Sequence, residues 1–73
     1  MGLFGLSKSQ KMNAFIRGRT DAGAAMSAPS GYSVPCPFSD ENMKMWWGAG
    51  WEWEMSPVTR HTLTPSKDSN YWG

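Results

Sequence analysis

Residues in the first third of the chain recur at steps of three and four, which is the spacing of side chains on one face of an α-helix. The recurring positions are Met12, Phe15, Ile16, Arg19, Gly23 and Met26. A neighbouring stripe contains only small residues, namely Ala14, Gly18, Ala22 and Ala25. Ser7 or Ser9 can cap this helix, which the pattern predicts over about residues 9–26. The alternative is that Gly23 ends the helix early, because glycine costs about 1 kcal/mol of helix propensity relative to alanine.

A second helix is predicted over about residues 40–55. Ser39 is a suitable N-cap. Asp40 and Glu41 follow in the first turn, where the helix dipole favours negative charge. Pro57 predicts the end of this helix one or two residues earlier, because a proline disfavours helical geometry in the residue that precedes it.

The second predicted helix has one broad aromatic face. That face carries Met43, Trp46, Trp47, Gly50, Trp51 and Trp53. We expect Trp47 and Trp51 to be mostly buried and Glu52, which lies outside the face, to be exposed. A side chain at position 50 would hold the first helix away, so we expect the helices to cross with Gly18 or Ala22 against Gly50.

The connection between the helices is rich in proline. Residues 27–38 contain three prolines and one glycine, which excludes a helix there. We expect an extended loop, packed on the helices through three apolar side chains. These are Tyr32, Val34 and Phe38.

The end of the chain has no period. Residues 57–73 contain two prolines with many serines and threonines, and we expect a mostly irregular tail. Its last aromatic residues, Tyr71 and Trp72, either fold back on the helices or anchor a partner. The predicted fold is therefore all-α: two antiparallel helices joined by a long Pro-rich loop form a domain over residues 1–56, and an irregular C-terminal tail follows.

Length and composition limit the architecture to one small domain. A chain of 73 residues is marginal on its own, because a domain of this size buries only about 60% of its unfolded surface. Five Trp, two Tyr and three Phe offset that deficit. A single Cys excludes an internal disulfide and indicates a reducing, cytoplasmic compartment. The apolar start at residues 1–6 is too short to cross a bilayer, so we expect no membrane association.

Charge is unevenly distributed, although the formal net charge is only +1. The first 38 residues contain one acidic residue, Asp21, and four basic ones: Lys8, Lys11, Arg17 and Arg19. Residues 39–56 contain one basic residue, Lys44, and four acidic ones: Asp40, Glu41, Glu52 and Glu54. The first predicted helix could therefore contact phosphates, whereas the second would be repelled by them.

Three short motifs resemble a known family. The first consists of Arg17-Gly18 followed by Ala22-Gly23, the second is Cys36-Pro37-Phe38, and the third consists of Trp47, Gly50 and Trp51. In this order, and with this separation of the cysteine from the first tryptophan, the motifs resemble the bacterial ribosome modulation factor family over roughly residues 12–55. The Cys-Pro to Trp-x-x-Gly-Trp part is the most specific element of the resemblance.

The resemblance implies a function without catalysis. The family consists of small two-helix cytoplasmic proteins that bind the small ribosomal subunit near the 3′ end of its rRNA. They block mRNA placement and promote inactive, hibernating ribosome dimers. The resemblance therefore implies that this chain regulates translation, that its partner is the small subunit or its rRNA, and that it needs no cofactor and no small-molecule substrate.

No catalytic or metal-binding constellation is visible in the residues themselves. His61 is the only histidine and lies in the predicted tail, where we interpret it as a solvated loop residue. Cys36 stands between two prolines, and we expect a structural role for it rather than a nucleophilic one. One Cys and one His are too few for a structural zinc site. These observations predict that the protein is not an enzyme.

Two classes of binding function remain open. One is a ribosome-binding modulator, and the other is a protein-binding adaptor on the same fold, encoded by a phage or mobile element and aimed at a host or virion protein. Near-neutral charge favours the adaptor, and the motifs favour the modulator. The candidate rRNA- or partner-binding residues are Lys8, Lys11, Arg17, Arg19, Trp53, Tyr71 and Trp72.

Overall fold

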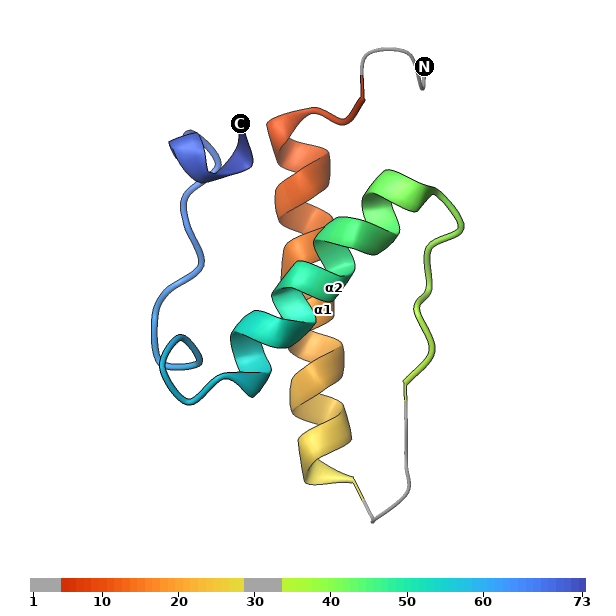
Figure 1. The fold of residues 1–73 in the computed structure, drawn as a ribbon, viewed down its shortest axis with the longest axis vertical. Coiled ribbons are helices and arrows are strands. Elements are labelled where there is room, and N and C mark those ends of the chain that lie inside the picture. Colours follow the sequence, from red (N-terminus) through yellow and green to blue (C-terminus); the bar gives the residue numbers. More distant parts are fainter. Residues whose placement is uncertain (1–4, 29–33) are drawn as a thin grey trace.

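The chain forms two α-helices that pack against each other, followed by a short 3-10 helix (Figure 1). The computed structural model describes residues 5–28 and 34–73. Helix α1 spans Lys8–Ser27, α2 spans Glu41–Met55, and η2 spans Asn70–Trp72. Neither described range contains a strand, so the predicted all-α class is confirmed. Both α-helices also lie within a residue or two of their predicted limits.

Helix α1 begins at a capping box, which selects Ser7 from the two candidate caps. The Ser7 hydroxyl accepts a hydrogen bond from the Gln10 backbone N–H at 3.2 Å. In return, the Gln10 side chain accepts from the Ser7 N–H at 2.9 Å, so two otherwise unpaired donors are satisfied. The helix then continues through Gly23 to Ser27, which answers the open question of an early end.

Helix α2 is capped by Asp40, and the prediction of Ser39 as the cap is wrong by one residue. The Asp40 carboxylate accepts from the backbone N–H groups of Asn42 at 2.8 Å and Met43 at 3.1 Å. A carboxylate is the stronger acceptor here because it is charged and lies at the positive end of the helix dipole. The helix ends at Met55, two residues before Pro57, as predicted.

The helices touch backbone to backbone where they cross. A Cβ atom at Gly18 would collide with the Trp47 carbonyl group and the Trp51 nitrogen. A Cβ atom at Gly50 would collide with the backbone of Phe15. The predicted close crossing is therefore present. The two glycines do not face each other, because each packs on the backbone of the opposite helix about one turn away from the other glycine.

The relative direction of the helices differs from the prediction. In Figure 1 both helices begin at the upper end of the molecule and descend, crossing obliquely rather than running antiparallel. Long-range pairs agree with this, because Lys11 lies 5.7 Å from the Trp46 ring and Arg19 pairs with Glu54. Antiparallel neighbours are enforced only by a short connection. The long loop instead lets the chain return, and residues 34–40 run back alongside the helices to the end where α1 began.

The described part of the loop is extended, as predicted. Val34 and Phe38 are half-buried, in agreement with their expected packing, while Pro35 and Pro37 are exposed. Tyr32, the third expected contact, lies outside the described residues.

The fully buried core lies between the two helices and includes the end of the chain. Its fully buried apolar side chains are Ala14, Phe15, Ala22 and Trp72. Trp47 and Trp51 are not among these residues, but each keeps only a minor part of its surface exposed, in agreement with the expectation that both are mostly buried. Their rings lie together on the flank of the crossing, 5.0 Å apart. Glu52 is exposed, as predicted.

Candidate functional site

The C-terminal segment, residues 57–73, folds back along the helices toward the start of α1 (Figure 1). This is the first of the two arrangements left open by the sequence. The ring of Trp72 lies 5.3 Å from Phe15 and 5.4 Å from Trp46. Tyr71 lies 5.6 Å from both Phe15 and Trp53. These five residues are called the aromatic cluster below.

Most pairs in the aromatic cluster meet edge to face. Phe15 meets Trp53, Tyr71 and Trp72 at interplanar angles of 74°, 78° and 82°. Such pairs contribute about 0.5–1.5 kcal/mol each beyond the burial of their surface. The Trp72 indole N–H donates to the Ser66 carbonyl at 2.6 Å, so the buried ring leaves no polar atom unpaired. Burial also raises the pKa of Tyr71 above its ordinary value.

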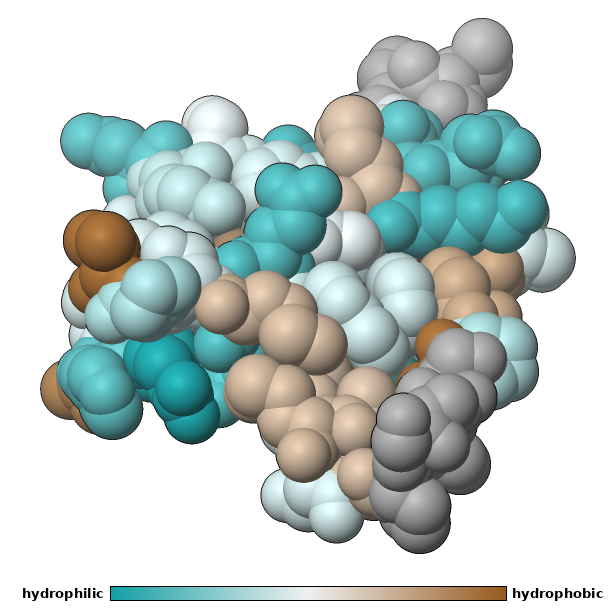
Figure 2. All heavy atoms as spheres, turned by 60° about the horizontal axis from the view of Figure 1, so that its bottom comes forward, coloured by the Kyte–Doolittle hydropathy of each residue, from teal (hydrophilic) through white to brown (hydrophobic). Residues whose placement is uncertain are grey.

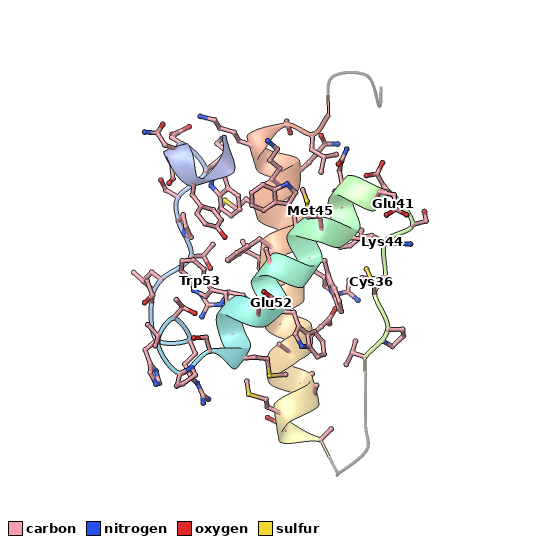
Figure 3. All side chains as sticks on the ribbon, in the orientation of Figure 1. Cys36, Glu41, Lys44, Met45, Glu52 and Trp53 are labelled. Carbon is pink, nitrogen blue, oxygen red and sulfur yellow. The ribbon has the colours of Figure 1, made fainter. Side chains whose placement is uncertain are left out.

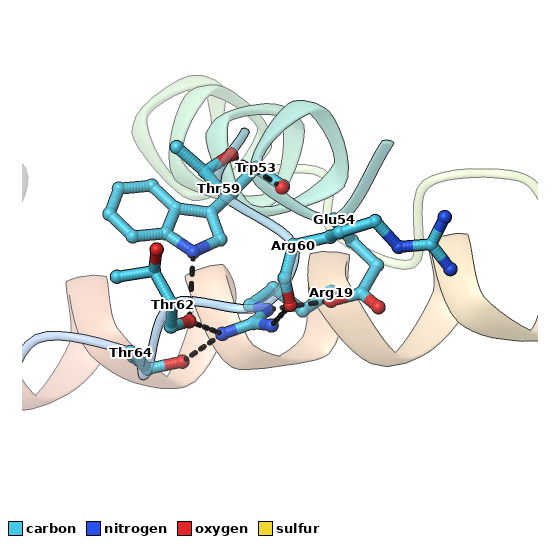
Figure 4. A network of polar contacts seen from close by, with 7 residues as sticks. All are labelled: Arg19, Trp53, Glu54, Thr59, Arg60, Thr62 and Thr64. Atoms are coloured by element: carbon cyan, nitrogen blue, oxygen red, sulfur yellow. Dashed lines mark hydrogen bonds and ion pairs between the residues drawn. The ribbon is translucent and has the colours of Figure 1, made fainter. Parts of the chain in front are cut away.

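Arg19 ties the C-terminal segment to both helices (Figure 4). Its Nε donates to Glu54 Oε1 on α2 at 2.8 Å. Its two Nη atoms donate to the segment, to the Arg60 carbonyl at 2.9 Å and to the Thr62 carbonyl and Thr64 hydroxyl, both at 3.0 Å. The side chain is only 18% exposed. The guanidinium predicted to contact phosphates is therefore held by acceptors of its own chain.

Lys11 makes a second tie near the end of the segment. Its Nζ donates to the Trp72 carbonyl at 2.7 Å and lies 5.7 Å from the centre of the Trp46 ring, within the range of a cation–π interaction. Two of the four basic residues predicted to bind phosphates thus hold the C-terminal segment in place.

Arg17 belongs to a separate polar group on another face of α1. It pairs with Asp21 one turn later, at 3.0 Å from Nε to Oδ2. The same carboxylate oxygen accepts from the Trp47 indole N–H at 2.9 Å. Asp21 is a buried residue of α1, so it positions Trp47 at the crossing. The Arg17 side chain remains 53% exposed.

The four basic residues of α1 do not form one surface. At 3.6 residues per turn, Lys8 and Arg17 point about 180° apart. Lys8, Lys11 and Arg19 instead share the face that also carries Phe15. The sequence therefore predicted a single set of four phosphate contacts. In the structure, Lys11 and Arg19 contact the C-terminal segment, Lys8 is exposed on the same face of α1, and Arg17 lies on the opposite side.

The residues that carry the family resemblance have unequal structural roles. The helix crossing brings Gly18, Trp47, Gly50 and Trp51 together. Gly23 has open space where a Cβ would stand. Cys36 is half-buried, and its Sγ lies 3.7 Å from the Phe38 carbonyl oxygen. Figure 3 places Cys36 on the side of α2 opposite to Trp53 and the C-terminal segment.

Large apolar side chains are exposed at several places. The most exposed are Val58 and Leu63, at 82% and 88%, both in the C-terminal segment. Met26 and Met55, near the ends of α1 and α2, are partly exposed. Figure 2, which brings this end of the molecule forward, shows separate apolar areas bordered by hydrophilic residues.

The described residues contain neither a cluster of metal-ligating side chains nor a helix that could span a membrane. His61 is exposed in the turn after α2. Within residues 5–28 and 34–73, no three His, Cys, Asp or Glu side chains group as metal ligands would. Across these same ranges, each helix is too short or too polar to cross a membrane.

Sequence reasoning missed the ties made by Arg19 and the role of Asp21. The spacing of Arg17 and Asp21 by four residues is a local signal that could have been found. Nothing in the sequence connects Arg19 with Thr62 or Thr64, because these contacts depend on where the segment folds back. Comparison with protein-family models, with curated proteins and with solved structures finds no match to this chain.

Proposed function

We propose that this protein is a ribosome-binding modulator of translation that contacts the rRNA of the small subunit. One observation carries the proposal. The glycines and tryptophans through which the sequence resembles ribosome modulation factors, Gly18, Trp47, Gly50 and Trp51, meet at one close helix crossing. Residues this far apart in the chain serve a common structural purpose, which supports a shared fold rather than a chance match of motifs.

The basic face of α1 is the surface proposed to contact rRNA. Lys8 is exposed, and Lys11 and Arg19 lie on the same face, next to the aromatic cluster. Cations that alternate with aromatic rings are typical of proteins that bind unpaired nucleotides. Arg17 is set apart from this face and is proposed to make at most a separate, peripheral phosphate contact.

Co-sedimentation with purified small subunits across a salt series tests the proposal. Each phosphate contact adds roughly one unit to the slope of log affinity against log salt. Replacing the exposed Lys8 by Gln should weaken binding and make this slope shallower. Lys67→Gln is the matched control, because Lys67 is an exposed cation on the C-terminal segment. If the wild-type protein is absent from the pellet at low salt, the proposal is wrong.

A second candidate function is a protein-binding adaptor that recognises a host or virion protein. It is favoured by the strong exposure of Val58 and Leu63 and by the net charge of +1. Apolar contacts of this kind would retain a partner independently of salt. Leu63→Ser should then abolish retention, whereas it should leave binding to small subunits unchanged if the rRNA proposal is correct.

A further inference from the structure

The C-terminal segment lies on a stripe in which cations and an aromatic ring alternate. Lys11, Phe15 and Arg19 follow each other at intervals of four residues on α1. This spacing puts them on one face, over about 12 Å of helix. Trp46 and Trp53 of α2 lie beside the stripe, with the Trp53 ring 5.3 Å from that of Phe15. The five residues form a composite surface from both helices, called the covered face below.

The covered face is occupied by oxygen atoms and rings of the C-terminal segment. Lys11 binds the Trp72 carbonyl oxygen, and Arg19 binds oxygen atoms of Arg60, Thr62 and Thr64. Tyr71 and Trp72 lie against the aromatic side chains. The segment therefore offers oxygen acceptors to the cations and flat rings to the aromatic residues. An unpaired RNA strand offers the same two chemistries, through its phosphates and its bases.

The segment is attached at two places, at its end and just after α2. Besides the bonds to Arg19, the Trp53 indole N–H donates to the Thr62 carbonyl at 3.3 Å and the Thr59 hydroxyl donates to the Trp53 carbonyl at 2.7 Å. Trp72 is its only fully buried side chain among residues 57–73. Most of the preceding side chains are exposed or half-buried, and the backbone there forms turns rather than a long helix. Releasing the rings of Tyr71 and Trp72 and the hydrogen bonds to Lys11, Arg19 and Trp53 would uncover the whole face. This release does not require α1 and α2 to separate at Gly18 and Gly50.

We propose that the covered face is a binding site for single-stranded RNA, and that the C-terminal segment is an intramolecular competitor for it. The inference rests on the proposed function, because it identifies how the same basic face of α1 reaches rRNA. RNA binds when the segment is displaced, so the apparent affinity of the full chain is the intrinsic affinity reduced by the open fraction. Glu54 is paired with Arg19 while the segment covers the face, which limits the charge that the face presents.

The test measures binding of a short, unstructured, fluorescein-labelled RNA to full-length variants by anisotropy. Trp72→Ala removes the buried ring and should tighten binding about tenfold or more, since the closed form then no longer dominates. Adding Lys11→Gln to that variant should reverse the gain. Leu63→Ala is the control, because Leu63 is exposed and its loss leaves the segment in place. A synthetic peptide with the sequence of residues 57–73 should displace RNA from the Trp72→Ala variant.

Hydrogen–deuterium exchange on the wild-type chain keeps the inference testable if Trp72→Ala does not fold. Saturating RNA should increase exchange in residues 66–73 and leave α2 protected. RNA binding without that increase, or no RNA binding by the wild type even at the highest concentration, overturns the inference. The proposed function is tested separately. If small subunits bind the wild type and Trp72→Ala equally well, the proposed function is supported and competition by the C-terminal segment is contradicted.

Discussion

The close helix crossing predicts opposite effects for two glycine substitutions on the same helix. Gly50→Ala places a methyl group against the backbone of Phe15, which cannot move aside like a flexible side chain. Separating the helices should cost about 2–3 kcal/mol, the upper part of the range for overpacking, and the gain in helix propensity returns about 1 kcal/mol. We therefore expect a net loss of about 1–2 kcal/mol, which corresponds to a melting temperature lower by about 4–16 °C for a domain of this size.

Gly48→Ala is the matched control in the same helix. A Cβ at position 48 meets nothing within 4 Å, so only the gain in helix propensity of about 1 kcal/mol remains. Its melting temperature, followed by circular dichroism at 222 nm on the same day and in the same buffer, should rise by a few degrees. If Gly50→Ala is as stable as the wild type while Gly48→Ala behaves as expected, the backbone contact at the crossing is refuted.

Three further predictions concern the polar ties and the C-terminal segment. Arg19→Gln should lower the free energy of unfolding by about 1–3 kcal/mol and speed tryptic cleavage after Arg60. The control Lys44→Gln breaks only the exposed pair with Glu41 at 3.7 Å and should change the free energy of unfolding by less than about 1 kcal/mol. Equal rates of proteolysis in both variants would refute the role of Arg19 in holding the C-terminal segment. Asp21→Ala should cost about 1–3 kcal/mol in urea unfolding because the Trp47 indole N–H loses its acceptor, and Asp21→Asn, which keeps an acceptor, should cost less. Burial raises the pKa of Tyr71 above 10.0, so the contribution of the neutral ring to the free energy of unfolding should be complete below pH 10.0 and be lost as the pH rises through the pKa of the folded state. A Tyr71→Phe variant that loses as much stability as the wild type over this pH range would contradict the prediction.

The helices were predictable because their signals are local. Capping, periodicity and the proline after α2 act within a few residues, and they placed both helices correctly. The close approach at Gly18 and Gly50 was also predictable, since only a small residue fits between two packed backbones. The cap of α2 was misplaced by one residue because Ser39 and Asp40 are both good caps, and sequence alone does not show which side chain reaches the N–H groups.

The relative direction of the helices and the composition of the core depended on long-range contacts. A loop as long as residues 28–40 allows either direction, so periodicity could not decide between them. Trp72 is fully buried because the C-terminal segment returns to Phe15, and no local pattern encodes that return. The same return engages Lys11 and Arg19, whereas the separation of Arg17 from the other three basic residues follows from the helix period alone and could have been found in the sequence.

Chemical footprinting of small-subunit rRNA tests the central proposal most directly. The purified full-length protein is bound to small subunits at low salt, and the accessibility of each rRNA nucleotide is compared with and without it. The proposed function predicts protection concentrated near the 3′ end of the rRNA, as the family resemblance implies, and loss of that protection as salt is raised. An unchanged footprint from a protein that nevertheless sediments with the subunits would contradict it, because contact would then be made through ribosomal proteins.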